Sequence, residues 1–134
     1  MKSLQLPRTL VNQLLTQAQK NTEIEACGLI GHSDQGFSLY PVDNIAQQSE
    51  QLFEMDPQQQ IAAMKAMREK GEQLFAIYHS HPNAPASPSA TDWEQMSYKD
   101  VYYLIISLNT VGVLEMTAYW PTENNFAKVA LEIS

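Results

Sequence analysis

The sequence predicts a single α/β domain in which a mixed β-sheet is flanked by helices. A chain of 134 residues and 15.1 kDa fits one domain that can bury a sizeable core. Hydrophobic residues make up 44% of the chain and charged residues 17%, a globular composition. Strand-like and helix-like segments alternate, and the chain ends in three consecutive strand-like segments, an order typical of a mixed sheet with helices on its faces. We therefore expect residues 1–134 to form one domain.

The first part of the chain predicts a helix followed by a β-hairpin. Pro7 stands in the first turn of an amphipathic helix that reaches Ala18. The apolar run over residues 26–31 is typical of a buried strand. A turn at residues 34–36 then leads into a return strand over residues 37–42.

The rest of the chain predicts two helices and four strands. Asp56 and Pro57 indicate a helix start, and Gly71 is expected to close that helix. Ser89 is expected to cap a short helix that ends near Met96. The expected strands cover residues 74–78, 102–108, 113–120 and 126–133, and the last three are joined by turns at 109–112 and 121–125.

Charge and cysteine content exclude several classes of function. The chain has 8 Lys and Arg against 15 Asp and Glu, a net charge of −7, whereas nucleic acids and anionic membranes bind clustered basic residues. The longest apolar run, residues 101–106, is far shorter than the roughly 20 residues that span a bilayer. No export signal precedes residue 7, so we expect a cytoplasmic protein. The single Cys27 excludes a disulfide scaffold and is expected to be buried and inert.

Three residues near the middle of the chain have the chemistry of a metal site. His79 and His81 follow a predicted strand, and side chains two residues apart in a strand point to the same face. Asp92 can add a carboxylate oxygen from the following helix. Two imidazoles and one carboxylate suit tetrahedral zinc with an open fourth position, as in catalytic sites. Taken alone, these residues leave open a chance pair of surface histidines and a Ser-x-x-Asp helix cap.

The spacing of these residues carries a family resemblance. His79-x-His81, seven residues, Ser89, two residues and Asp92 is similar in full to the zinc signature of the JAMM metalloproteases, also called the JAB/MPN family. The segment 25–31, Glu-Ala-Cys-Gly-Leu-Ile-Gly, resembles the strand that carries the family's catalytic glutamate. The resemblance extends over nearly the whole chain. It implies a curved sheet between helices, in a layered fold like that of cytidine deaminases.

The resemblance also implies a role for each matched residue. His79, His81 and Asp92 would bind one Zn²⁺ per chain. Glu25 would accept a proton from the zinc-bound water and return it to the leaving amine. Ser89 would donate a hydrogen bond to the oxyanion of the tetrahedral intermediate.

Residues beside the signature have simpler interpretations. Glu23 competes with Glu25 for the role of base, but the spacing to Cys27 favours Glu25. Ser80 is expected to face away from the two histidines and to bond the backbone. We expect Trp93 to pack behind the helix that carries Asp92.

The resemblance points to a small protein as substrate. Compact, stand-alone members of the family imply cleavage after the C-terminal Gly-Gly of a small ubiquitin-like sulfur-carrier protein, at a peptide or isopeptide bond. Only 42 residues follow Asp92, so we expect little room for the inserted loops that grip ubiquitin in deubiquitinating members. An extended Gly-Gly tail fits a narrow channel because it has no side chains.

Three alternative functions are weighed against this interpretation. A JAMM-type hydrolase of cell-wall peptides would usually carry a second module or an export route, and we expect neither. A non-catalytic MPN scaffold would have lost its ligands, whereas all five signature residues are present. A nucleoside or base deaminase would need a Pro-Cys-x-x-Cys motif, which a chain with one cysteine lacks.

Overall fold

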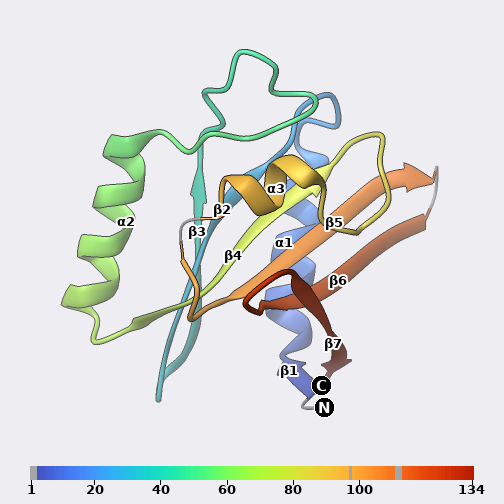
Figure 1. Ribbon diagram of the computed structural model, residues 1–134. Helices are drawn as coiled ribbons and strands as arrows, with labels where there is room; N and C mark the ends of the chain where they lie inside the picture. Colours follow the sequence, from blue (N-terminus) through green and yellow to red (C-terminus); the bar gives the residue numbers. More distant parts are fainter. Residues whose placement is uncertain (1–2, 97, 111–112) are drawn as a thin grey trace.

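Seven strands form one mixed sheet with three helices around it in the computed structural model, which describes residues 3–96, 98–110 and 113–134 (Figure 1). The strand order across the sheet is β1-β7-β6-β5-β4-β2-β3. The predicted α/β class and mixed sheet are thereby confirmed. In chain order the elements are β1 (Ser3–Leu6), α1 (Arg8–Gln19), β2 (Cys27–Ser33), β3 (Gly36–Val42), α2 (Pro57–Glu69), β4 (Gln73–His81), α3 (Ala90–Glu94), β5 (Tyr102–Thr110), β6 (Val113–Pro121) and β7 (Phe126–Ile133).

The sheet is mixed because two of its strand pairs are parallel. Strand β4 pairs with β5 in parallel, and the chain between them contains α3. Strand β1 pairs with β7 in parallel at one edge. The remaining neighbours pair antiparallel.

The structure corrects the predicted strands in two places. Strand β1 was not predicted, because its alternation of exposed and buried residues covers only four positions before Pro7. Strand β4 runs on to His81, because Ser80 and His81 still pair with β5. The two histidines therefore lie within a strand that is paired on both sides, and not after its end.

Helix α3 is shorter than predicted, and part of one predicted turn lies outside the described residues. Helix α3 ends at Glu94, two residues before the predicted Met96. Residues 111 and 112 of the predicted 109–112 turn lie outside the described residues. Strands β5 and β6, on either side of it, are confirmed, although β5 continues to Thr110 and so includes the first two residues of the predicted turn.

Helix α2 begins and ends as its sequence indicates. The Asp56 side chain accepts hydrogen bonds from the backbone amides of Gln58 and Gln59, which an N-cap residue is expected to do. After the helix, Gly71 has a φ of 72°, a left-handed conformation that glycine adopts without steric cost.

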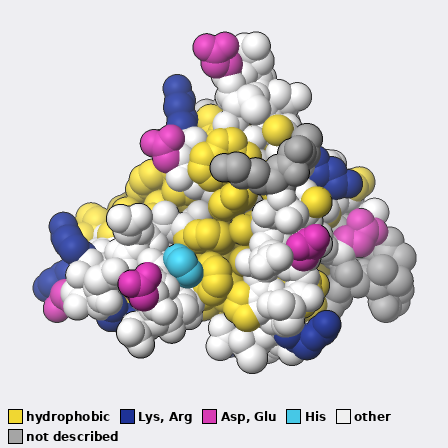
Figure 2. All heavy atoms as spheres, turned by 90° about the horizontal axis from the view of Figure 1, so that it is seen from below, with side chains coloured by type: hydrophobic (Ala, Val, Ile, Leu, Met, Phe, Trp, Pro, Cys, Tyr) yellow, Lys and Arg dark blue, Asp and Glu magenta, His cyan; other side chains and the backbone are white. Residues whose placement is uncertain are grey.

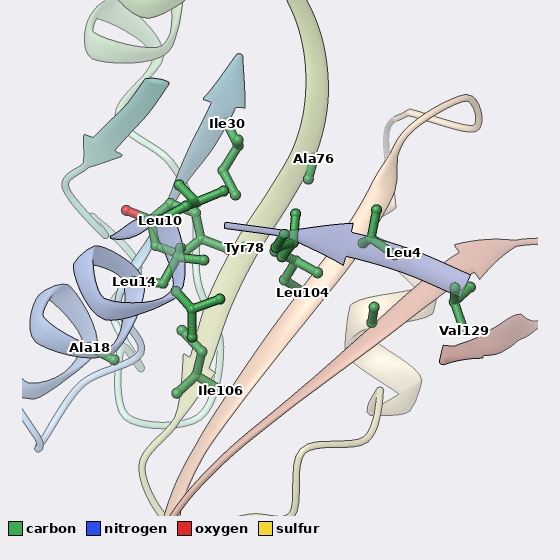
Figure 3. Close-up of a cluster of buried hydrophobic side chains, with 13 residues drawn as sticks. Leu4, Leu10, Leu14, Ala18, Ile30, Ala76, Tyr78, Leu104, Ile106 and Val129 are labelled. Atoms are coloured by element: carbon green, nitrogen blue, oxygen red, sulfur yellow. The ribbon is translucent and has the colours of Figure 1, made fainter. Parts of the chain in front are cut away.

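Helix α1 packs on one face of the sheet and forms the larger core cluster (Figure 3). Its buried residues Leu10, Leu14 and Ala18 lie against Tyr78 and Ile106 in the centre of the sheet (Figure 3). This spacing of three and four residues is the apolar stripe of an amphipathic helix. Alternation along β4 then places Ile77 in a second core cluster, on the opposite face.

The second core cluster includes α2 and supports the functional site. Met67 and Ala63 of α2 are buried in it, and Met64 packs against it. Because side chains alternate along β4, His79 and His81 share the face of Ile77. Both histidines are thus directed into the layer that contains α2 and α3 (Figure 1).

The surface view adds the distribution of charge on one face. Apolar side chains occupy the centre of the face in Figure 2, and Lys and Arg side chains lie apart from one another toward its edge. In the described part of the chain, no helix has both the length and the apolar character that crossing a membrane requires.

Candidate active site

The two histidines of β4 bring their rings together at the end of the strand. His79 and His81 are both buried, with 2% and 3% of their surface exposed. Their Nε2 atoms lie 3.1 Å apart. The predicted convergence of the two imidazoles is confirmed, and it follows from the two-residue repeat of a strand.

Asp92 reaches the same point from the first turn of α3. Ser89 is the N-cap of this helix, and its hydroxyl accepts a hydrogen bond from the Asp92 amide at 3.0 Å. In return, Asp92 Oδ2 accepts one from the Ser89 amide at 2.9 Å, which completes a capping box. The same oxygen lies 3.2 Å from Nε2 of each histidine. Ser-x-x-Asp is therefore both a helix cap and part of the site.

The three atoms fit a tetrahedral metal ion. They form a triangle with sides of 3.1 and 3.2 Å. Zinc with bonds of about 2.0 Å to nitrogen and oxygen requires ligand atoms about 3.3 Å apart in a regular tetrahedron. Four residues, Glu25 included, place one potential ligand atom each within 4.8 Å of one another.

The hydrogen bonds of His81 leave its inner nitrogen available for a metal. Its Nδ1 lies 2.8 Å from the carbonyl oxygen of Pro85. Because a carbonyl only accepts, Nδ1 carries the proton, and in the neutral ring Nε2 keeps its lone pair. A metal-binding histidine is commonly oriented in this way by a partner on its other nitrogen. His79 differs, since its buried Nδ1 has no hydrogen-bond partner among the described residues.

Charge interactions among the three side chains shift their pKa values in different directions. Burial raises the pKa of Asp92, but its close contacts with the imidazoles of His79 and His81 outweigh this effect and hold the pKa well below its ordinary value. Burial lowers the pKa of His79 and determines its net direction. Burial also lowers the pKa of His81, but the hydrogen bonds to Asp92 and Pro85 reverse the shift, so the net pKa is raised. An ionised carboxylate beside imidazoles is a ligand set suited to a divalent cation.

Glu25 stands beside this triangle because of the pairing between β2 and β4. Cys27 lies opposite His79, and the antiparallel register continued by two residues brings Glu25 across from His81. Glu25 is buried, with 3% of its surface exposed, and its Oε1 has no hydrogen-bond partner among the described residues. Glu23, its competitor, is exposed. The structure therefore brings Glu25, and not Glu23, to the candidate ligands.

The surroundings of Glu25 suit proton transfer. Burial raises the pKa of Glu25 to about 7, with His81 lowering it and Asp92 raising it by smaller amounts. A carboxylate with a pKa near neutrality can both accept and donate a proton at ordinary pH. Together with the three candidate ligand atoms, it forms a candidate metal site with an adjacent carboxylate.

Ser89 lies at the edge of the site and is exposed. Its oxygen accepts one hydrogen bond from the Asp92 amide, and the described residues offer no acceptor for its hydroxyl proton, which can therefore be donated to another group. Ser80 faces the opposite side of β4, as predicted, and its hydroxyl accepts a hydrogen bond from the Ala26 amide at 2.8 Å. That bond fixes the residue next to Glu25.

The loop between β4 and α3 is held by residues that the sequence did not single out. Ser107 donates a hydrogen bond to the carbonyl of Ala84 at 2.7 Å. Tyr119 donates one to the carbonyl of Ala86 at 2.8 Å. Both donors come from strands later in the chain, β5 and β6, so only the tertiary fold brings them to this loop.

The expectations for Cys27 and Trp93 are confirmed. Cys27 is fully buried, and burial raises the pKa of its thiol to about 12, so it is not a nucleophile. Trp93 packs edge-on against Phe126, with ring centroids 5.1 Å apart. His32 is exposed on the rim of the sheet and lies against Phe37.

A pocket of about 250 Å³ opens beside the ligand atoms. His79 and Asp92 are among the residues that line it. Its other walls are largely apolar and come from the segment after α3, from the sheet and from the segment before α2, and they include Phe53, Met55, Ile77, Met96, Tyr98 and Phe126. Phe53 also stacks on the His79 ring, with centroids 4.6 Å apart and planes at 27°. The sequence offers no signal for this contact, because Phe53 follows a largely polar stretch that carries no motif.

The family model described as prokaryotic homologues of the JAB domain matches residues 7–120. The chain belongs to this family. The prokaryotic JAB/MPN, or JAMM, resemblance inferred from the signature is thereby confirmed.

Curated relatives of this JAMM chain are similar over most of their lengths. The desampylase of Haloferax volcanii is 32% identical over 112 residues, which cover 81% of this chain and 78% of the relative. The CysO-cysteine peptidase of Mycobacterium tuberculosis is 30% identical over 113 residues, covering 82% and 77%. A probable TtuB-protein conjugate cleaving protease of Thermus thermophilus is 29% identical, covering 75% and 68%.

Solved structures show the same fold. A solution structure of a protein from Desulfitobacterium hafniense superposes with a TM-score of 0.84 at 30% identity, covering 97% of this chain and 92% of the other. The crystal structure of a JAB1/MPN domain protein from Archaeoglobus fulgidus has a TM-score of 0.60 at 19% identity, covering 100% and 99%. The second likeness supports the JAMM fold alone.

Proposed function

We propose that residues 1–134 act as one JAMM-type zinc peptidase domain that cleaves after the C-terminal Gly-Gly of a small ubiquitin-like protein. The observation that carries the proposal is the buried Glu25 beside the triangle formed by His79, His81 and Asp92. The names of the relatives support it, since they include a desampylase, a CysO-cysteine peptidase and a probable TtuB-conjugate protease. The cytoplasmic location expected from the sequence stays a prediction.

Each signature residue has one task in the proposed reaction. His79, His81 and Asp92 hold the zinc, which when bound lowers the pKa of a water ligand to about 7 and polarises the scissile carbonyl. Glu25 accepts the proton of the attacking water and later delivers it to the leaving amine, a contribution of about 10²–10⁴-fold in rate. Ser89 donates its hydroxyl proton to the developing oxyanion, worth roughly 3 kcal/mol. The burial of Glu25, which raises its pKa, supports the first of these proton transfers.

The pocket beside the ligands supports a substrate with an apolar residue near its cleaved end. It adjoins His79 and Asp92 but is not lined by Glu25, which serves the leaving amine. We therefore assign the pocket to the acyl side of the bond, where the carrier tail lies. In this assignment the two glycines lie in a narrow channel beside His79 and Asp92, and an aliphatic side chain upstream of them occupies the apolar part of the pocket.

Of the alternative functions, the scaffold has less support from the site, and the cell-wall hydrolase differs from the proposed function only in its substrate. A non-catalytic scaffold would not require a buried, unpartnered carboxylate beside three converging ligand atoms. A cell-wall peptide hydrolase of JAMM type would use the same site. Only a comparison of substrates separates it from the proposed function.

The assignment of the pocket predicts the effect of a charged residue in its wall. Met96→Glu places a carboxylate among apolar side chains, so binding of an apolar tail residue should weaken. We expect KM for a carrier substrate to rise about tenfold or more, with kcat little changed, because 1.4 kcal/mol of lost binding corresponds to a tenfold change. Steady-state kinetics would measure this. A fall in kcat at unchanged KM would contradict the assignment.

The proposed function is tested with ubiquitin-like carriers that have one or several residues after Gly-Gly. The zinc-loaded protein is incubated with each carrier, and mass spectrometry locates the cut. We expect cleavage directly after the second glycine. A matched carrier ending in Gly-Val before the extension should resist cleavage, because a side chain does not fit the narrow channel. Cleavage of cell-wall peptides without cleavage of any carrier would instead support the alternative hydrolase.

A further inference from the structure

We propose that Asn44 is a positioning residue that fixes the catalytic base Glu25 and the ring of His79 from outside the site. The proposal rests on the peptidase function proposed above. It concerns the segment of residues 45–54, between β3 and α2, which no part of the JAMM signature includes. Asn44 lies directly before this segment and contacts it with both of its polar side-chain atoms.

The two ends of the Asn44 amide organise the segment in different ways. Its Oδ1 accepts hydrogen bonds from the amides of Ala46 and Glu54, both at 3.0 Å. Its Nδ2 lies within hydrogen-bond distance of three carbonyl oxygens, those of Glu25 at 2.9 Å, Leu52 at 3.0 Å and Ser49 at 3.4 Å. One half-buried side chain thus closes the loop and ties it to the strand that follows Glu25.

The backbone of Glu25 depends on these contacts because it precedes the paired part of β2, which begins at Cys27. Its amide donates to the carbonyl of Ser49 at 2.7 Å, and its carbonyl accepts from Asn44. The backbone of Glu25 is thus hydrogen-bonded to the Asn44 side chain and to Ser49, which belongs to the segment of residues 45–54. Among the described residues, Oε1 of the Glu25 carboxylate has no hydrogen-bond partner, so the backbone contacts contribute to its position.

The same segment also orients His79. Whereas His81 is held by the Pro85 carbonyl, His79 Nδ1 has no hydrogen-bond partner in the described chain. Its ring is instead stacked against Phe53, which lies next to Glu54 in the segment. Asn44 therefore acts on a metal ligand through Phe53 and on the base through the backbone of Glu25.

The first test measures the segment without any substrate. Amide hydrogen exchange is compared in the wild type, Asn44→Ala and Asn44→Asp, with Gln47→Ala as a matched control, since Gln47 is exposed in the same segment. We expect faster exchange across residues 45–54 and at Glu25 in Asn44→Ala. In Gln47→Ala the exchange rates should equal those of the wild type. Asn44→Asp keeps the acceptor oxygen, so Ala46 and Glu54 should stay protected while Glu25 loses protection. Unchanged exchange in Asn44→Ala would overturn the proposal.

The second test measures zinc affinity by competition with a chelating dye. Residues that orient a metal ligand typically change metal affinity by about 10–100-fold when they are removed. We expect a loss of this size in Asn44→Ala and in Phe53→Leu, which removes the stacked ring. Wild-type affinity in both variants would exclude the path through Phe53. If Asn44→Ala does not fold, Phe53→Leu and Asn44→Asp still decide this point.

The third test separates positioning from a structural role by a double-mutant cycle at saturating zinc. Asn44→Ala should lower kcat about 10–100-fold with KM little changed, because small misplacements of a base are costly. In the background of Glu25→Gln the same change should have little further effect, since the group it positions is already lost. If Asn44→Ala lowers kcat by the same factor in Glu25→Gln as in the wild type, Asn44 has a structural role only. If the wild type cleaves no carrier, the peptidase proposal fails, and the exchange and zinc measurements still judge Asn44.

Discussion

His79 and His81 bind their surroundings in different ways although they share one face of one strand. His81 is fixed by a hydrogen bond to the Pro85 carbonyl, and His79 by stacking on Phe53. Asp92 Oδ2 joins them, because it lies 3.2 Å from both Nε2 atoms. The site therefore consists of three ligand atoms that are each oriented by a separate contact.

The first prediction at the residue scale concerns the metal. Purified protein should contain about one zinc per chain, and His79→Ala or Asp92→Ala should lose it, because two remaining ligands hold zinc weakly. Elemental analysis measures the content. His32→Ala is the matched control, since His32 is the exposed histidine and lies on the rim of the sheet, and it should keep the zinc. Equal zinc in all variants would show that the metal binds elsewhere.

The residues of the site were predictable to different degrees. His79, His81, Ser89, Asp92 and Glu25 could be predicted because each lies in a short motif whose spacing is visible in the chain. Asn44 and Phe53 could not, because their effect depends on a loop conformation and on contacts with β4. Ser107 and Tyr119 were missed for the same reason, since both act on a loop that is distant in sequence.

Helix α3 shows how a short element can position a ligand. Its five residues are too few to be stable alone, so the capping box, the Trp93–Phe126 contact and the held loop before it fix its place. The Ser89 amide holds Asp92, and the Ser89 hydroxyl holds the Asp92 backbone. The hydroxyl thus serves both the helix and, in the proposed mechanism, the oxyanion.

The capping box predicts different effects for two substitutions of Ser89. Ser89→Ala should lower kcat about 10²-fold through loss of the oxyanion donor and should lower the free energy of unfolding by about 1 kcal/mol through loss of the cap. Ser89→Thr keeps the hydroxyl and should restore most of both. Zinc content should be unchanged, because the amide that holds Asp92 remains. A Ser89→Ala variant with full activity would exclude the oxyanion role.

At the element scale, most boundaries followed from local patterns and a few did not. The cap of α2 and the hairpin of β2 and β3 were predicted because their residues act locally. Strand β1 was missed because its pairing partner, β7, lies at the other end of the chain. The last three residues of β4 were missed because histidine and serine are strand-forming here only through pairing with β5.

At the scale of the whole molecule, the sheet is covered on both faces and the site lies on only one. A second polar cluster lies away from the site, where Glu72 accepts hydrogen bonds from Ser38 at 2.6 Å and from Tyr40. Lys70 lies 3.8 Å from the same carboxylate. The cluster links β3 to the turn after α2, so we assign it a role in stability.

This cluster predicts how stability depends on pH. Burial raises the pKa of Glu72, but the hydrogen bonds from Ser38 and Tyr40 and the charge of Lys70 outweigh it, so the folded-state pKa is lowered. A lowered folded-state pKa stabilises the protein above the unfolded-state value of about 4.3, and this stabilisation is lost as the pH falls through the folded-state value. Glu72→Gln should therefore cost about 1–2 kcal/mol at pH 7 and progressively less in acid.

Urea unfolding of the wild type and Glu72→Gln at several pH values measures the difference. Glu69→Gln is a matched control, because Glu69 is exposed at the end of α2, and it should change stability little. A stability difference between the wild type and Glu72→Gln that grows as the pH falls would contradict the assigned sign.

The central claim is that a carboxylate, Glu25, performs proton transfer beside a zinc held by three other residues. It is tested most directly by the cleavage rate of Glu25→Gln, measured against the wild type and against Glu23→Gln at equal zinc content. We predict that Glu25→Gln keeps its zinc and loses at least about 10²-fold in rate, the usual contribution of a general base, while Glu23→Gln matches the wild type. Wild-type cleavage by zinc-loaded Glu25→Gln would contradict the mechanism.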